Sequence, residues 1–174
     1  KKERKHFITC WGRCQFVKGR YSVPTELITM WQQSYGKLFA LELLKAFNEK
    51  SKTYIKVNKL KADKEHVKVK LKDECIKAED YNCFEDILSI SSSAFTSLDS
   101  YKDGLYHIQD LSAQIVCEII KPETGETVFD TCSAPGGKSF TLAQIMMNKG
   151  KVVSSEIHEN RINMIRNGAK RLGI

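Results

Sequence analysis

The chain has 174 residues, of which 41% are hydrophobic, and a formal net charge of +7 at pH 7. This length and hydrophobic content predict one domain, or two small ones, with a real core. No apolar run approaches the roughly 20 residues of a membrane-spanning helix, so we expect no membrane partner.

The cysteine pattern favours free thiols. Six cysteines are scattered along the chain without the spacing of a zinc site, and Cys10 and Cys14 are the only close pair. Unpaired thiols suit the reducing cytoplasm. We therefore predict a cytoplasmic protein without a metal site.

Residues 1–20 are expected to form a basic arm or linker. They hold seven Lys or Arg and one Glu, together with the aromatic residues Phe7, Trp11 and Phe16. Cations can meet phosphates and aromatic rings can stack on bases, so the arm suits RNA. The alternative is a solvated lead-in to the next domain.

Residues 21–103 are expected to hold two helices and then a small mixed α/β module. Ser22 or Thr25 can cap a helix with Pro24 in its first turn, ending near Tyr35. Beyond Gly36 a second helix is expected. It runs from Lys37 to Asn48 with an apolar face of Leu38, Ala40, Leu41, Leu44 and Phe47.

The module itself alternates short strands with a helix. Residues 54–57 alternate as a strand does, and Asp63 can cap a lysine-rich helix over about residues 64–73. Short strands are expected near 75–80 and 86–90, with Ser89–Ser93 as a polar turn. The lysines of this module either face RNA or form a solvated surface; they are Lys56, Lys59, Lys61, Lys64, Lys68, Lys70 and Lys72.

Residues 104–174 carry the strongest pattern in the chain. Asp110 or Ser112 can cap a helix with Leu111, Ile115, Val116 and Ile119 on it. An apolar strand then ends at Asp130, the small residues 133–137 form a loop, and a helix begins near Ser139. A second strand, residues 151–156, ends at Glu156, and a helix with Ile162, Ile165, Ala169 and Leu172 follows. Strand, helix, strand and helix open a doubly wound, Rossmann-like sheet.

Three interpretations of the glycine loop compete. The first is an ordinary strand-to-helix turn. The second is a phosphate-binding P-loop, but the position of its first glycine holds Cys132. The third is a site for S-adenosylmethionine, and it is favoured by Asp130, the glycines and Glu156, because nucleotide-binding α/β folds place an acid about 20 residues after the loop to accept from ribose hydroxyls.

Residues 130–138, Asp-Thr-Cys-Ser-Ala-Pro-Gly-Gly-Lys, resemble the cofactor loop of the RsmB/Sun-type rRNA (cytosine-5) methyltransferases, D-x-C-A-A-P-G-G-K. Four weaker segments are similar to that family in the same order. They are Tyr21-Ser22-Val23-Pro24 with Trp31, the strand Lys56–Lys61 (R-V-N-x-L-K), Gly104–Asp110 (G-x-x-x-x-Q-D) and Arg166–Gly173 (R-x-N-x-x-R-L-G).

The resemblance implies a fold and a site. The fold is a small mixed α/β RNA-recognition-like module followed by the first half of a Rossmann-like class I methyltransferase sheet. The residues implied around the cofactor S-adenosylmethionine are Cys132, Ser133, Ala134, Pro135, Gly136, Gly137 and Lys138, with Glu156 on the ribose hydroxyls and Arg161 close by. Ser133, Glu156 and Gly168 depart from the family's usual alanine, aspartate and asparagine. A glycine within a helix costs about 1 kcal/mol relative to alanine, so we expect Gly168 to loosen the last helix.

The resemblance also implies a cysteine nucleophile that attacks C6 of cytosine, and a second cysteine that helps to release the product. In the family these lie in later D-A-P-C and T-C-S motifs. Thr131-Cys132-Ser133 mimics the second motif, but its place after the first strand makes it part of the cofactor loop, so no catalytic residue is assigned. We expect an inactive fragment of an enzyme that methylates C5 of a cytosine in small-subunit ribosomal RNA. We also expect self-association through the truncated sheet edge. The alternative is a non-catalytic RNA-binding module whose glycine loop is structural.

Overall fold

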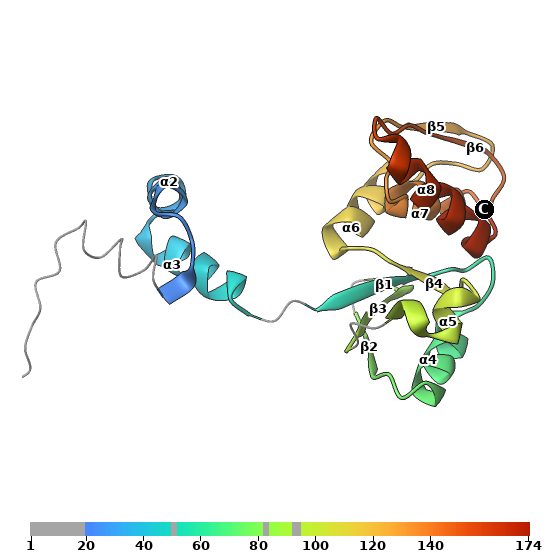
Figure 1. Cartoon of the computed structure of the whole chain (residues 1–174), viewed down its shortest axis with the longest axis horizontal. Helices are drawn as coiled ribbons and strands as arrows, with labels where there is room; N and C mark the ends of the chain where they lie inside the picture. Colours follow the sequence, from blue (N-terminus) through green and yellow to red (C-terminus); the bar gives the residue numbers. More distant parts are fainter. Residues whose placement is uncertain (1–19, 50–51, 82–83, 92–94) are drawn as a thin grey trace, which may run out of the picture. The chain divides into compact units, whose positions relative to one another are not determined.

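The computed structural model describes residues 20–49, 52–81, 84–91 and 95–174 (Figure 1). The chain divides into two compact units, Lys1–Ser51 and Lys52–Ile174. The predicted basic arm, including Cys10 and Cys14, lies outside the described residues except for Arg20. Within the described ranges, none of the helices combines the length and the apolar character needed to cross a bilayer.

The described part of the first unit, residues 20–49, contains the helices α2 (Thr25–Tyr35) and α3 (Lys37–Phe47). Gly36 joins them with φ of 80°. The predicted side-chain cap is wrong, because α2 follows Pro24 directly and no side chain caps it. The predicted apolar face of α3 is only partly right: Ala40 and Leu44 are buried, whereas Leu38 is 83% exposed.

The second unit begins with a four-stranded antiparallel sheet in the order β2-β3-β1-β4. Its elements in chain order are β1 (Thr53–Val57), α4 (Lys64–Asp73), β2 (Ala78–Asp80), β3 (Ile87–Ile90), the 3-10 turn η1 (Phe95–Ser97), α5 (Asp99–Lys102) and β4 (Tyr106–Ile108). The cap predicted for α4 is confirmed, because the Asp63 carboxylate accepts a hydrogen bond of 2.8 Å from the His66 N–H. The predicted turn at Ser89 is wrong, because Ser89 and Ile90 belong to β3.

Strand alternation separates the two faces of this sheet. Ile55 and Val57 point into a core shared with Val67 and Leu71 of α4, and the partners of Ile55 across the ladder, Leu88 and Ile108, pack there as well. The opposite face carries Lys56 and its cross-strand partners Ile87 and His107.

The remaining elements form a second, parallel sheet and its helices. They are α6 (Leu111–Ile120), β5 (Thr127–Asp130), α7 (Gly137–Ile145), β6 (Lys151–Ser154) and α8 (Glu159–Leu172). Strands β5 and β6 pair in parallel, with Thr127 opposite Lys151 and Asp130 opposite Ser154. This β-α-β arrangement agrees with the pattern in the sequence.

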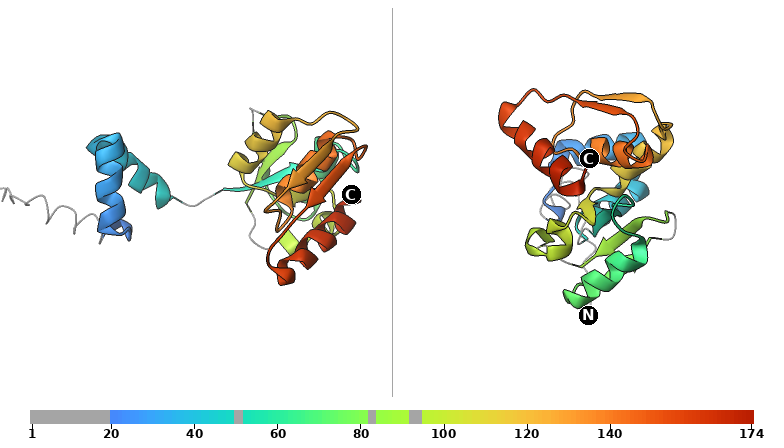
Figure 2. Two further views of the ribbon diagram at one scale, coloured as in Figure 1. Left: turned by 90° about the horizontal axis from the view of Figure 1, so that it is seen from above. Right: turned by 90° about the vertical axis from the view of Figure 1, so that its right-hand side faces the viewer.

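The second unit is layered (Figures 1 and 2). Helices α4 and α5 cover one face of the four-stranded sheet, α6 and α7 cover the other, and β5 and β6 lie beyond α7. Lys56 shows how closely the second face is covered: it is 2% exposed, and its ammonium lies 2.8 Å from Asp86 and 2.9 Å from Glu118 of α6. Lys56 therefore neither faces solvent nor is available to RNA.

Helix α6 buries a polar and a thiol side chain rather than its largest apolar ones. Gln114 and Cys117 are its buried residues, whereas Val116 is 42% and Ile119 78% exposed. The buried side of α6 makes polar contacts: the Gln114 amide donates to the Gln109 carbonyl at 2.9 Å, and the Cys117 thiol donates to the Lys138 carbonyl of α7 at 3.8 Å.

Candidate cofactor site

The loop between β5 and α7 is folded by hydrogen bonds to its own ends. The Ser133 hydroxyl donates to the Asp130 carbonyl at 2.7 Å, and the Gly136 N–H donates to the Ser133 carbonyl at 2.6 Å. The Ser133 N–H donates to the Ser155 carbonyl just beyond β6 at 3.0 Å. The loop is thereby held at the carboxyl ends of both parallel strands, where α/β folds bind ligands.

Asp130 fixes the loop to helix α7. Its carboxylate accepts from the Ser139 hydroxyl at 2.6 Å and from the Cys132 N–H at 3.3 Å. The Ser154 hydroxyl in turn donates to that of Ser139 at 3.0 Å. Asp130, predicted from the sequence to mark the site, therefore shapes the loop through these hydrogen bonds.

Two glycines, Gly136 and Gly168, lie close against the ring of Phe140. Gly136 immediately precedes α7 with φ of 112°, and a Cβ atom there would collide with the ring. A Cβ atom on Gly168 of α8 would lie 2.5 Å from the Cζ atom of the same ring. Gly168 therefore permits the close approach of α8 to α7, and α8 continues through it from Glu159 to Leu172. That Gly168 loosens this helix stays a prediction.

The amino end of α7 points its first N–H groups toward the loop. The first turn of any α-helix leaves N–H groups without partners in the helix, and these favour anions and electronegative ligand atoms. Gly136 is buried and Gly137 half-buried, and neither adds a side chain to this end of the helix. Cys132 and Lys138 are exposed on the same segment.

Glu156 and Arg161 lie against the loop. An Arg161 guanidinium nitrogen donates to the Ala134 carbonyl at 2.9 Å, and another lies 3.4 Å from Glu156 Oε2. The His158 N–H donates to Glu156 Oε1 at 3.0 Å. This hydrogen bond lowers the pKa of Glu156, with further contributions from the Arg161 charge and the Ala134 backbone, so the carboxylate is ionised.

One atom of this group is of particular interest. The Glu156 side chain is only 1% exposed, and its Oε2 atom is buried without a hydrogen bond from any described residue. The Arg161 guanidinium pairs with this oxygen at 3.4 Å without forming a hydrogen bond, so a lone pair of Oε2 stays available to a hydroxyl group of a ligand. The structure thus brings the loop, Glu156 and Arg161 to one place, and their contacts with a ligand stay a prediction.

A group of hydrogen bonds, here called the α8 clamp, holds the carboxyl end of α8, and no pattern in the sequence predicted it. The Asn58 amide donates to the Gly104 and Leu172 carbonyls, both at 2.9 Å. The Lys61 ammonium donates to the Arg171 carbonyl at 2.8 Å. Three segments that resemble the family therefore meet here, and the exposed Lys61 donates to backbone carbonyls in or next to the other two.

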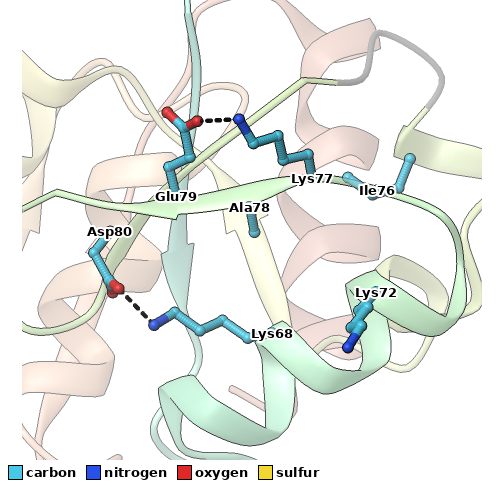
Figure 3. Close-up of a pocket in the computed structure, with 7 residues that line it drawn as sticks. All are labelled: Lys68, Lys72, Ile76, Lys77, Ala78, Glu79 and Asp80. Carbon is cyan, nitrogen blue, oxygen red and sulfur yellow. Dashed lines mark hydrogen bonds and ion pairs between the residues drawn. The ribbon is translucent and has the colours of Figure 1, made fainter.

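A separate open pocket of about 510 Å³ lies between α4 and β2 (Figure 3). Lys68 reaches Asp80 at 2.6 Å, and Lys77 reaches Glu79 at 2.7 Å. The hydrogen bond to Asp80 raises the pKa of Lys68. Since these cations are paired with acids of the same pocket, the pocket is a weaker candidate for an anionic ligand than the loop.

Comparisons with known proteins agree with this arrangement. The sequence model of the RsmF/B-like ferredoxin-like domain matches residues 23–95, and that of the 16S rRNA methyltransferase RsmB/F matches residues 117–174. The chain is 32% identical over 88% of its length to a probable ribosomal RNA small subunit methyltransferase B of Bacillus subtilis, covering 34% of that protein. It is 33% identical over 86% of its length to the ribosomal RNA small subunit methyltransferase B of Photorhabdus laumondii, again covering 34%. The chain thus spans about a third of these relatives.

Solved structures show the same fold. PH0851 superposes with a TM-score of 0.87 at 27% identity, over 92% of this chain and 37% of that one. A methyltransferase homolog protein from Pyrococcus horikoshii gives 0.80 at 25% identity, over 93% and 53%. NSun6 from the same organism, solved with SFG, gives 0.82 at 17% identity, over 87% and 63%. The predicted fold class is confirmed: a ferredoxin-like module followed by part of a methyltransferase sheet.

Proposed function

Because the chain belongs to the RsmB/F family of rRNA methyltransferases, we propose that the β5–α7 loop and Glu156 bind S-adenosylmethionine. We further propose that the reaction served is methyl transfer to C5 of a cytosine in small-subunit ribosomal RNA. The cofactor would supply the methyl group from its sulfonium.

Each residue of the site has a proposed part. Ionised Glu156 accepts from the ribose hydroxyls through Oε2, and Arg161 keeps that carboxylate beside the Ala134 carbonyl. The backbone of residues 132–138 surrounds the methionine and ribose portions, where the glycines allow close approach. The observation that carries the proposal is the buried, ionised Glu156 with one oxygen lacking a hydrogen bond, next to a glycine loop at a helix amino end.

Catalysis needs groups that these residues do not supply. The 174 residues contain neither the D-A-P-C motif nor a T-C-S motif outside the cofactor loop. We therefore propose that this chain alone binds the cofactor without turning it over. RNA is the proposed partner, in keeping with the net charge of +7.

Calorimetric titration with S-adenosylmethionine tests the cofactor site. Glu156→Ala should weaken binding by roughly 10- to 100-fold, the usual effect of losing a hydrogen bond to a charged group. Glu156→Asp keeps the carboxylate and should retain most of the affinity. Gly136→Val should abolish binding, since its side chain would meet the Phe140 ring.

A matched control is Glu79→Ala, which removes an acid from the α4–β2 pocket and should leave the affinity unchanged. Wild-type protein that binds RNA but gives no heat with the cofactor would contradict the proposal and favour the non-catalytic RNA-binding module. Equal affinities for Glu156→Ala and wild type would remove Glu156 from the site.

A further inference from the structure

We propose that Gln109 and Thr141 are positioning residues that fix the first turn of α7, and with it the glycine loop, against the ferredoxin-like sheet. Their effect on cofactor affinity rests on the proposed function. The placement itself rests on a buried polar node that joins the end of β4 to α7.

The Thr141 hydroxyl is the centre of this node. It lies 2.6 Å from Gln109 Oε1, 3.1 Å from the Gly137 carbonyl and 3.2 Å from His107 Nε2. A hydroxyl has one proton and two lone pairs. Donation to Gln109 is the shortest contact, so the hydroxyl accepts from a protonated His107 Nε2.

This assignment agrees with the state of His107. Its Nδ1 atom is buried without a hydrogen bond in the described structure, as expected for the unprotonated nitrogen of a neutral ring. Burial lowers the pKa of His107 to about 4. The imidazole of His107 is therefore neutral near pH 7, so the node is held by hydrogen bonds between uncharged groups.

Gln109 connects the node to the rest of the fold. Its N–H donates to the Tyr54 carbonyl of β1 at 3.2 Å, and its carbonyl accepts from the Gln114 amide of α6 at 2.9 Å. Its side-chain carbons pack against Gly137, with Cγ 3.6 Å from the position of a Cβ atom there. Gln109 thus touches the sheet, α6 and the first turn of α7.

The node reaches the loop through α7. The Gly137 carbonyl is one of the oxygens beside the Thr141 hydroxyl, and Gly136 immediately precedes it in the loop. Thr141 is 0% and Gln109 5% exposed, so water cannot replace a lost partner. Removal of the Thr141 hydroxyl would take away the donor to Gln109 Oε1 and the acceptor beside His107 Nε2, and the first turn of α7 would lose its lateral support.

The test compares Thr141→Val, which keeps the shape and loses the hydroxyl, with Thr141→Ser, which restores the hydroxyl. Amide hydrogen exchange of residues 136–141 is measured without ligand, with β1 as an internal reference for global opening. Calorimetry gives the S-adenosylmethionine affinity. Ile145→Val, a change at a half-buried position of the same helix, is the matched control.

Thr141→Val should accelerate exchange in residues 136–141 relative to β1 and weaken cofactor binding, each by roughly 10-fold, the effect of about 1.4 kcal/mol. Thr141→Ser and Ile145→Val should both stay within about 3-fold of wild type. Unchanged exchange in Thr141→Val, or equal effects of Val and Ser, would overturn the proposal. If the wild type binds no cofactor, the proposed function fails, and the exchange rates alone decide the positioning role.

Discussion

Gly168→Ala isolates the packing around Phe140. In an exposed helix this substitution stabilises by about 1 kcal/mol. Here the new Cβ atom would lie 2.5 Å from Cζ and 2.7 Å from Cε2 of the Phe140 ring, whereas carbon atoms in contact prefer about 3.5–4.0 Å. The ring is 5% exposed and also lies against Gly136, so it has little room to move away by the ångström that is needed.

Overpacking of this kind costs about 1–3 kcal/mol. After the gain in helix propensity, we expect Gly168→Ala to lower the free energy of unfolding by up to about 2 kcal/mol. Urea denaturation measures this change. In a Phe140→Leu background, where the ring is absent, the same alanine should be neutral or stabilising, which gives a coupling energy of about 2 kcal/mol.

Asn167→Ala, on the exposed side of α8, is the control and should change stability by less than about 0.5 kcal/mol. The reasoning would be refuted if Gly168→Ala stabilised the protein by its full helix-propensity gain. Equal effects of the alanine in the wild-type and Phe140→Leu backgrounds would refute it as well.

Three other predictions concern pH, the α8 clamp and association. The pKa of His107 is about 4 in the folded state, whereas its ordinary value is 6.5. The unfolded chain therefore binds the proton at a higher pH than the folded protein does. We expect the free energy of unfolding to be highest above pH 6.5 and to fall as the pH drops towards 4. Denaturation curves of His107→Gln should lack this slope, and parallel pH profiles for the two proteins would contradict the assignment. Asn58→Leu should cost about 2 kcal/mol or more in urea denaturation, because two buried carbonyls lose their donor; a loss below about 0.5 kcal/mol would argue against the clamp. Within the described ranges β5 and β6 pair only with each other, and Phe129 is 61% exposed, so sedimentation velocity should show concentration-dependent association that Phe129→Lys reduces; a monomer at all concentrations would count against it.

The cofactor half of the fold was predictable because its signals are local. The strand that ends at Asp130, the glycine turn and the helix after it follow one another within a short stretch, and backbone conformation there is set by neighbouring residues. The Asp63 cap was predictable for the same reason. The resemblance of residues 130–138 then suggested which ligand such a turn could serve.

Features that depend on distant partners were not predictable. In the sequence, Lys56 and Lys61 look like surface lysines. Nothing near them indicates that Lys56 pairs with Glu118 or that Lys61 donates to the Arg171 carbonyl at the end of α8. Helix α6 is apolar on most of its circumference, so the pattern could not show which side is buried. Gly168 suggested a weak helix because propensity ignores Phe140, which reaches it from another helix.

The covered second face of the four-stranded sheet limits the ways in which this module could bind nucleic acid. Four-stranded modules of the RNA-recognition type usually splay bases over an open sheet and stack them on aromatic rings. Here Lys56, Ile87 and His107 lie beneath helices of the same chain, so no such platform exists at the centre of this sheet. Any RNA held by this module would have to run along its rim or its helices, where contacts follow the sugar–phosphate backbone, and the choice of nucleotide would be left to other surfaces.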